Sequence, residues 1–179
     1  MLSKLLSNIK KIFILNDKES PKILLIDNEN DYKLYANFLV KNFKYVTQGF
    51  KILYPNGQQI DFNVIVKNNK YEAMTLLWQK FLVKKSSVYI LIANDKNPIG
   101  FAIMEPDHIL SYLFIDKEYR QQGFGSSILT FLKEKYNSFT VRIESNKYKS
   151  KLPKFYEKNN FKFVKKIKNY NEFYYEYKI

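Results

Sequence analysis

One continuous segment, residues 113–132, restricts the fold of this chain more than any other part of it. The apolar run Leu113–Ile115 is typical of a buried strand, and a stretch with apolar residues at helical spacing follows after a short polar loop that contains Gly123 and Gly125. The first N–H groups of a helix are unpaired and electropositive, and glycines let an anion reach the backbone there. The segment therefore predicts an α/β fold with a pyrophosphate-binding turn.

Two better-known phosphate loops do not fit this segment. A dinucleotide-binding Rossmann turn needs three glycines and an acidic residue after the next strand, and the first glycine is absent here. A Walker A loop needs Gly-Lys followed by Ser or Thr, which is also absent. Taken alone, the segment also fits an ordinary glycine-bearing turn between a strand and a helix.

Composition narrows the chemistry that the chain can use. Its 179 residues fit one compact domain, and 46% of them are hydrophobic, which is enough for a packed core. With no Cys and His108 as the single histidine, disulfides, thiolate zinc sites, a Cys nucleophile and multi-histidine metal sites are excluded, so no metal is expected. The missing Cys and the lack of a signal-peptide pattern favour the cytoplasm. A net charge of +13 fits anionic partners such as a nucleotide cofactor or RNA, although a solvated lysine-rich surface explains it equally well.

Hydrophobic periodicity and turn residues predict alternating strands and helices, and hence a mixed α/β sheet with helices on its faces. Helices are expected over residues 29–43, 71–83, 123–136 and 153–159, and strands over residues 22–26, 50–54, 60–66, 88–93, 99–104, 108–115, 139–143, 161–167 and 172–177. Asn56-Gly57 predicts a hairpin with a type I′ turn. A further amphipathic helix over residues 2–13 is expected to pack on its own domain, with attachment to a membrane surface as the alternative.

Two motifs resemble the GNAT superfamily of N-acetyltransferases. Arg120-Gln121-Gln122-Gly123-Phe124-Gly125 is similar to the family's Arg/Gln-x-x-Gly-x-Gly/Ala loop, and Leu113-x-Ile115-x-x-x-Tyr119 to the strand and approach ahead of it. Downstream, Phe155-Tyr156-Glu157-Lys158-Asn159-Asn160-Phe161 is similar to the family's Phe/Leu-Tyr-Glu-Lys-x-Gly-Phe segment. Asn160 replaces the family's glycine, which is tolerable because Asn also accepts left-handed conformations. The resemblance covers residues 45–179 as the acetyltransferase domain and leaves residues 1–44 as an N-terminal extension.

The resemblance implies a GNAT-type mixed sheet, mostly antiparallel and flanked by helices, with a splayed strand pair for coenzyme A. The implied cofactor is acetyl-CoA. The backbone of Leu113, Phe114 and Ile115 would bind the pantetheine arm, and backbone N–H groups of the following loop would bind the pyrophosphate. The residues implied at this loop are Arg120, which would brace it, and Gln121, Gln122, Gly123, Phe124, Gly125 and Ser126.

The resemblance also places Tyr156 near the sulfur, where its phenol would protonate the leaving thiolate or at least donate a hydrogen bond to it. The general base stays open. Glu105 ranks first, a water relayed by Ser111 second and Glu144 third. Strand alternation is expected to put Ile109, Ser111 and Leu113 on the acceptor side of their strand and His108 on the other side.

These features predict an N-acyltransferase that moves an acetyl group from acetyl-CoA to a primary amine by direct attack. The acceptor is not identified. Because residues 146–179 contain ten Lys and three Glu, an RNA-linked amine (such as a charged tRNA) or a protein is considered. The alternative is a non-catalytic GNAT-fold module that senses acyl-CoA or binds RNA. A homodimer through the late strands, with Tyr174 and Tyr175 exposed, is a further expectation.

Overall fold

The computed structural model describes residues 21–46, 51–54, 56–93, 97–144, 151–167 and 172–178. The strands are β1 (Lys22–Ile26), β2 (Lys51–Leu53), β3 (Gln59–Asp61), β4 (Ser87–Ile92), β5 (Pro98–Glu105), β6 (Ile109–Ile115), β7 (Ser138–Glu144), β8 (Lys162–Ile167) and β9 (Glu172–Lys178). The helices are α2 (Glu29–Val46), α3 (Phe62–Asn68), α4 (Lys70–Val83), α5 (Phe124–Lys135) and α6 (Leu152–Lys158), with a short 3₁₀ helix η1 (Lys117–Tyr119). Within these ranges every predicted element is confirmed except the strand over residues 60–66.

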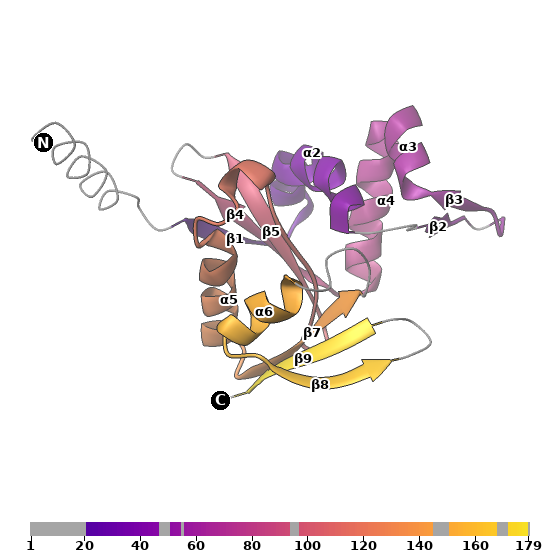
Figure 1. The fold of residues 1–179 in the computed structure, drawn as a ribbon. Coiled ribbons are helices and arrows are strands. Elements are labelled where there is room, and N and C mark those ends of the chain that lie inside the picture. The colour runs from indigo at the N-terminus through magenta and orange to yellow at the C-terminus, as the bar shows by residue number, and fades with distance from the viewer. Residues whose placement is uncertain are drawn as a thin grey trace, which may run out of the picture.

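Seven strands form one sheet in the order β1-β4-β5-β6-β7-β9-β8 (Figure 1). Neighbouring strands run antiparallel, except β6 and β7, which run parallel and are connected through α5. Parallel neighbours need such a crossover, because a tight turn can join only antiparallel strands. This is the mixed, mostly antiparallel sheet flanked by helices that was predicted.

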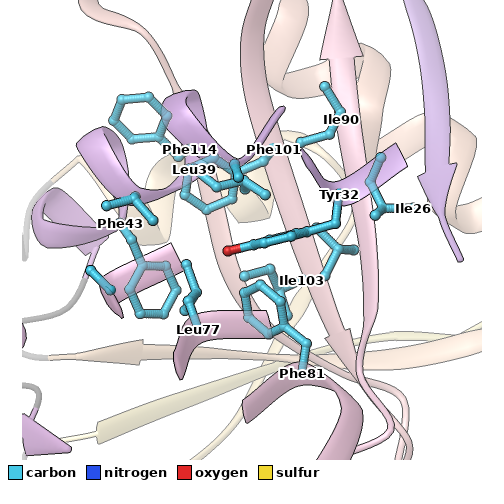
Figure 2. Packing of buried hydrophobic residues seen from close by; sticks show 14 of the residues in the cluster. Ile26, Tyr32, Leu39, Phe43, Leu77, Phe81, Ile90, Phe101, Ile103 and Phe114 are labelled. Carbon is cyan, nitrogen blue, oxygen red and sulfur yellow. The ribbon is translucent and has the colours of Figure 1, made fainter. Parts of the chain in front are cut away.

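Helices α2 and α4 cover one face of the sheet, and α3 packs against these two helices (Figure 1). In α2 the residues that recur every three or four positions form one buried stripe, namely Tyr32, Ala36, Leu39, Val40 and Phe43. The Tyr32 ring lies inside this cluster beside Phe81 and Ile103 (Figure 2). Its hydroxyl donates to the carbonyl oxygen of Met74 in α4 at 2.8 Å. These contacts fix α4 against the sheet, and Lys80 of α4 and its C-terminal cap Lys84 belong to the candidate site.

Helices α5 and α6 pack on the opposite face. Successive side chains of a strand point to opposite sides, so Val88 and Ile90 of β4 belong to the cluster with α2, whereas Tyr89 and Leu91 belong to the cluster with α5. The sheet therefore separates two buried clusters, one on the α2/α4 side and one on the α5/α6 side.

The boundary expected after residue 44 falls within α2. Strand β1 pairs with β4 along its whole length, and Leu39 and Phe43 of α2 are fully buried in the cluster that covers the sheet. Strand β1 and the buried residues of α2 therefore pack on the same sheet as the later elements, and the extent of the acetyltransferase domain stays a prediction. The amphipathic helix expected over residues 2–13 lies outside the described residues. Within the described ranges, no helix is long and apolar enough to cross a membrane.

The strand predicted over residues 60–66 is wrong beyond Asp61, because α3 begins at Phe62. The apolar residues from Ile60 to Val66 alternate as in a strand, and this pattern suggested the longer strand. The Asp61 carboxylate instead accepts the N–H of Asn63 at 2.8 Å and caps the helix. Local capping thus decides the structure of this stretch.

The hairpin around Gly57 forms, but its turn is not the predicted type I′. The N–H of Tyr54 donates to the carbonyl of Gln58 at 2.9 Å, and the N–H of Gly57 donates to the carbonyl of Tyr54 at 2.9 Å. Three residues therefore lie between Tyr54 and Gln58, the pair that closes the hairpin, whereas a hairpin with a type I′ turn has a loop of two residues. Gly57, at φ +82°, supplies the left-handed residue that such a three-residue loop needs.

The late strands do not expose Tyr175 as expected. Its side chain is only 4% exposed, and β9 is flanked by β7 on one edge and β8 on the other. The outer edge of this end of the sheet belongs to β8. The homodimer stays a prediction.

Candidate functional site

The sheet opens between β6 and β7. The two strands are in register only at Ile109–Leu110 of β6 and Thr140–Val141 of β7. Beyond that point β6 stays paired with β5, and β7 stays paired with β9. Within the described sheet, the edge of residues 113–115 that faces β7 therefore has no strand partner.

Past the end of β6, the chain turns through η1 into α5. The Asp116 carboxylate accepts the N–H of Glu118 at 3.3 Å and starts η1. The guanidinium Nε of Arg120 donates to the carbonyl of Ile115 at 2.8 Å, and the group lies 5.7 Å from the centre of the Phe114 ring. Arg120 thus links the loop to the end of β6.

The start of α5 is open and has no side-chain cap. Gly123 occupies the cap position at φ +90°, after Gln121 at φ +62°. Its carbonyl accepts the N–H of Ser126 at 2.9 Å, so the N–H groups of Phe124 and Gly125 fall in the first turn, where a helix offers them no carbonyl. A Cβ at Gly123 would meet no atom within 4 Å. This electropositive helix end has room for a phosphate group.

Gly125 has a different role from Gly123. A Cβ at Gly125 would lie 3.2 Å from Cζ of Phe155 and 3.8 Å from Cγ1 of Ile115. The missing side chain therefore allows α5 to approach both α6 and the end of β6. Gly123 therefore leaves the start of α5 accessible, and Gly125 allows α6 to pack close to it.

Tyr156 lies in the buried cluster on the α5/α6 side. Its side chain is 5% exposed, and its ring packs against Phe161 and Tyr175 at centroid distances of 5.5 and 6.4 Å. Leu113 and Ile115 of β6 pack against the same cluster. Burial raises the pKa of the Tyr156 phenol, so the group stays protonated at neutral pH and can donate a hydrogen bond.

A bulge in β6 interrupts the alternation of its side chains. The register with β5 passes from Ile103↔Tyr112 to Met104↔Leu110, so Ser111 has no residue opposite it. As a result, Tyr112 packs on the α2/α4 side and Leu110 on the α5/α6 side.

The bulge brings Ser111 close to Glu105, at the end of β5. The Glu105 carboxylate lies 3.5 Å from the ammonium of Lys84, on the α4 side of the sheet. Burial alone would raise the pKa of Glu105, but the Ser111 hydroxyl and the charges of Lys84 and Arg142 outweigh burial and hold that pKa below its ordinary value. Ser111 Oγ is buried, and no partner within the described residues meets hydrogen-bond geometry with it. Glu105 therefore stays ionised at neutral pH, beside a hydroxyl that can accept a further contact.

Three cations near Glu105 were not singled out from the sequence. Burial and the charges of Lys84 and Arg142 together lower the pKa of Lys80 to about 8, against the opposing charge of Glu105. The Lys80 ammonium also lies 5.5 Å from the centre of the Phe43 ring. No sequence signal connects these cations, because α4 and β7 are far apart in the chain and come together only in the folded structure.

Of the remaining positions that the sequence predicted, two differ in the structure, one is confirmed and one lies outside the described side chains. The predicted strand start at His108 is wrong, because this residue has φ +56° in the turn before β6, and Leu113 does not share a side with Ser111 because of the bulge. Asn160 adopts φ +64°, which confirms the left-handed conformation expected at the glycine position of the motif. The side chain of Glu144 lies outside the described residues.

Comparisons with known proteins agree with this geometry. A family model described as an acetyltransferase (GNAT) domain matches residues 84–163. Among solved structures, a GCN5-related N-acetyltransferase from Rhodopseudomonas palustris is 11% identical, with a TM-score of 0.56, over 90% of this chain and 98% of that one. A GNAT-family acetyltransferase from Desulfovibrio desulfuricans is 12% identical, with a TM-score of 0.56, over 89% and 99%. A spermidine N-acetyltransferase from Vibrio cholerae is 12% identical, with a TM-score of 0.59, over 88% and 93%. At such identities the structural similarity shows the fold alone, and no curated protein matches the chain.

Proposed function

We propose that this chain is an acetyltransferase of the GNAT superfamily and that it transfers an acetyl group from acetyl-CoA to a primary amine, because a GNAT-domain family model matches residues 84–163 and the fold is that of GNAT acetyltransferases. The opening between β6 and β7 carries this proposal, since its unpaired edge runs directly into the uncapped start of α5. Coenzyme A joins an extended chain with amide groups to a pyrophosphate. An open strand edge followed by an anion site matches that order of groups.

In this proposal, the backbone of Leu113, Phe114 and Ile115 binds the pantetheine amides as an additional strand would. The backbone N–H groups of residues 121–126 bind the pyrophosphate, and Arg120 holds their loop to β6. Acetyl-CoA supplies the activated acetyl thioester. The role of this part of the chain is to bind and orient it.

The two principal catalytic candidates lie on opposite sides of the sheet. Tyr156 belongs to the α5/α6 side, and Glu105 with Ser111 belongs to the α4 side. The amine would enter from the α4 side, and Glu105 would take its proton directly or through a water held by Ser111. Tyr156 would donate a hydrogen bond to the sulfur as the carbon–sulfur bond breaks. Because burial raises the pKa of this phenol, we favour hydrogen bonding over full transfer of its proton. Glu144 stays the third candidate base.

Calorimetric titration with acetyl-CoA tests the coenzyme site. Gly123→Ala would place a methyl group in the open space before α5, where the phosphate is expected. Gly57→Ala is a matched control, because Gly57 has a similar φ of +82° and a Cβ added there would also meet no atom within 4 Å, but it lies in the β2–β3 hairpin. Each substitution imposes similar backbone strain, about 1–2 kcal/mol. We expect saturable binding by the wild type and Gly57→Ala, and binding weaker by about tenfold or more in Gly123→Ala.

A wild type that does not bind acetyl-CoA would refute the proposal, since the loop would then be an ordinary turn. Equal weakening in both glycine variants would attribute the effect to strain and not to the site. Detection of free thiol with a panel of amines then tests transfer itself. Binding without thiol release from any amine would favour the non-catalytic module.

The identity of the acceptor amine stays a prediction. One structural relative is named a spermidine N-acetyltransferase, but at 12% identity that name does not assign an acceptor to this chain. An RNA-linked amine and a protein stay candidate acceptors. The cytoplasmic location also stays a prediction.

A further inference from the structure

The side of the β6–β7 opening that faces α4 carries more positive than negative charge. Lys80 and Lys84 come from α4 and its C-terminal cap, and Arg142 comes from β7. Within the described residues, Glu105 is the one carboxylate whose charge acts on Lys80. Among the described residues, three cations and one carboxylate therefore interact in this region.

These groups lie where the two strands part. Arg142 directly follows Val141, the last residue of β7 in register with β6, and Ser111 directly follows Leu110, its counterpart on β6. The residues on either side of Arg142 in β7 are buried in the cluster on the α5/α6 side, so alternation turns Arg142 toward the α4 side. Its charge acts on both Glu105 and Lys80. Ser111 and Arg142 thus flank the start of the opening.

Two features of this region suit a ligand with an anionic group. The Ser111 hydroxyl lies close enough to Glu105 to lower the pKa of that carboxyl, but its buried oxygen has no partner of hydrogen-bond geometry among the described residues and can accept a hydrogen bond from a ligand or a water. Burial and, to a smaller extent, the charges of Lys84 and Arg142 disfavour the charged form of Lys80, and a bound anion would offset the repulsion among these cations.

We infer that the acceptor amine carries a carboxylate or a phosphate group, which binds Lys80 and Arg142 while the amino group faces Glu105. The inference rests on the proposed acetyl transfer and adds the chemical class of the acceptor. Arg and Lys are the side chains that pair best with such anions. A polyamine would instead bring further positive charge toward three cations, so polyamines are poor acceptors in this inference.

Matched acceptors test this class. Amino acids are compared with their carboxamides, and phosphoethanolamine with ethanolamine, by initial rates of thiol release from acetyl-CoA; spermidine is included. The carboxamide keeps the shape of the amino acid and has a more easily deprotonated amine, so intrinsic reactivity favours the amide. A higher kcat/KM for the amino acid would therefore report recognition of the carboxylate. In the same way, a higher kcat/KM for phosphoethanolamine than for ethanolamine would report recognition of a phosphate group.

Two variants locate that recognition. Arg142→Gln and Lys80→Gln should each lower the ratio of kcat/KM for the anionic member of a pair to kcat/KM for the neutral member by about tenfold or more. Lys67→Gln, on the exposed surface of α3, is the matched control and should leave this ratio unchanged. An unchanged affinity for acetyl-CoA shows that each variant is folded.

A wild type that prefers carboxamides, ethanolamine or spermidine would overturn the inference. So would a preference for anionic acceptors that survives both Arg142→Gln and Lys80→Gln. If acetyl-CoA binds but no acceptor in the panel releases thiol, the inference is overturned while the coenzyme site stands, and the non-catalytic module is favoured. Failure of the wild type to bind acetyl-CoA would instead refute the proposed function itself.

Discussion

Lys80→Met tests the crowding of positive charge on the α4 side without any substrate. Burial and the neighbouring cations lower the pKa of Lys80 from its ordinary 10.5 to about 8. At pH 7 the lysine is charged in both the folded and the unfolded chain, so the folded state carries the full cost of burying that charge. Between about pH 8 and pH 10.5 the unfolded chain binds more protons than the folded one, and the stability of the wild type therefore rises with pH.

The size of the effect follows from these values. A pKa difference between 10.5 and about 8 corresponds to about 3.4 kcal/mol at 1.36 kcal/mol for each pKa unit. Lys80 is only partly buried, so solvent screening reduces this upper limit to about 2 kcal/mol. Methionine keeps much of the apolar stem but loses the cation–π contact with Phe43, which is worth about 0.5–1 kcal/mol. We expect Lys80→Met to be more stable than the wild type by about 1 kcal/mol at pH 7.

Urea unfolding at pH 7 and at pH 10 measures this difference. Most of the advantage of Lys80→Met should be lost at pH 10, because the wild-type lysine is then largely neutral in the folded state. Lys67→Met, at an exposed position of α3, is the control and should show no such gain. The many tyrosines of the chain titrate in the same way in all three proteins, so their effect cancels in the comparison. A less stable Lys80→Met at pH 7, or an advantage that does not change with pH, would refute the reasoning.

Three further substitutions address catalysis and fold. Tyr156→Phe should lower kcat by about tenfold or more at unchanged acetyl-CoA affinity, because only the hydrogen bond to the sulfur is removed; unchanged turnover in the thiol assay would exclude Tyr156 from the mechanism. Asp61→Ala should reduce the free energy of unfolding by about 1 kcal/mol, since Asp61 caps α3 through the N–H of Asn63 at 2.8 Å. Equal stability in urea would show that this cap does not hold α3. Gly100→Ala should cost about 2–4 kcal/mol, because its Cβ would lie 2.6 Å from the carbonyl oxygen of Phe114 on the neighbouring strand. Thermal unfolding at the wild-type temperature would contradict that close approach.

The segment from β4 to α5 was predictable because its signals are local. An apolar run, a turn residue or a helical repeat involves residues close together in the chain, and each one restricts the backbone directly. For the same reason, the left-handed conformation of Asn160 could be expected from its place in a motif. The stretch after Asp61 shows the limit of such signals, because alternating apolar residues fit a short strand as well as they fit a short capped helix.

The part of the candidate site on the α4 side could be predicted only in part. Glu105 and Ser111 were named because they end or occupy strands near the glycine loop. Their contact depends on a one-residue bulge in β6, which changes the side that each following residue faces. Lys80 and Arg142 join them only because α4 packs on the sheet and β7 lies beside β6.

The sequence by itself determined the alternation of strands and helices, the glycine turn before α5 and the family to which these motifs point. Tertiary structure alone decided where β6 and β7 part, which side of the sheet each catalytic candidate faces and which charges meet there. Local patterns restrict backbone angles over a few residues. The position of one charge relative to another across the sheet depends instead on strand register, and a single bulge shifts that register.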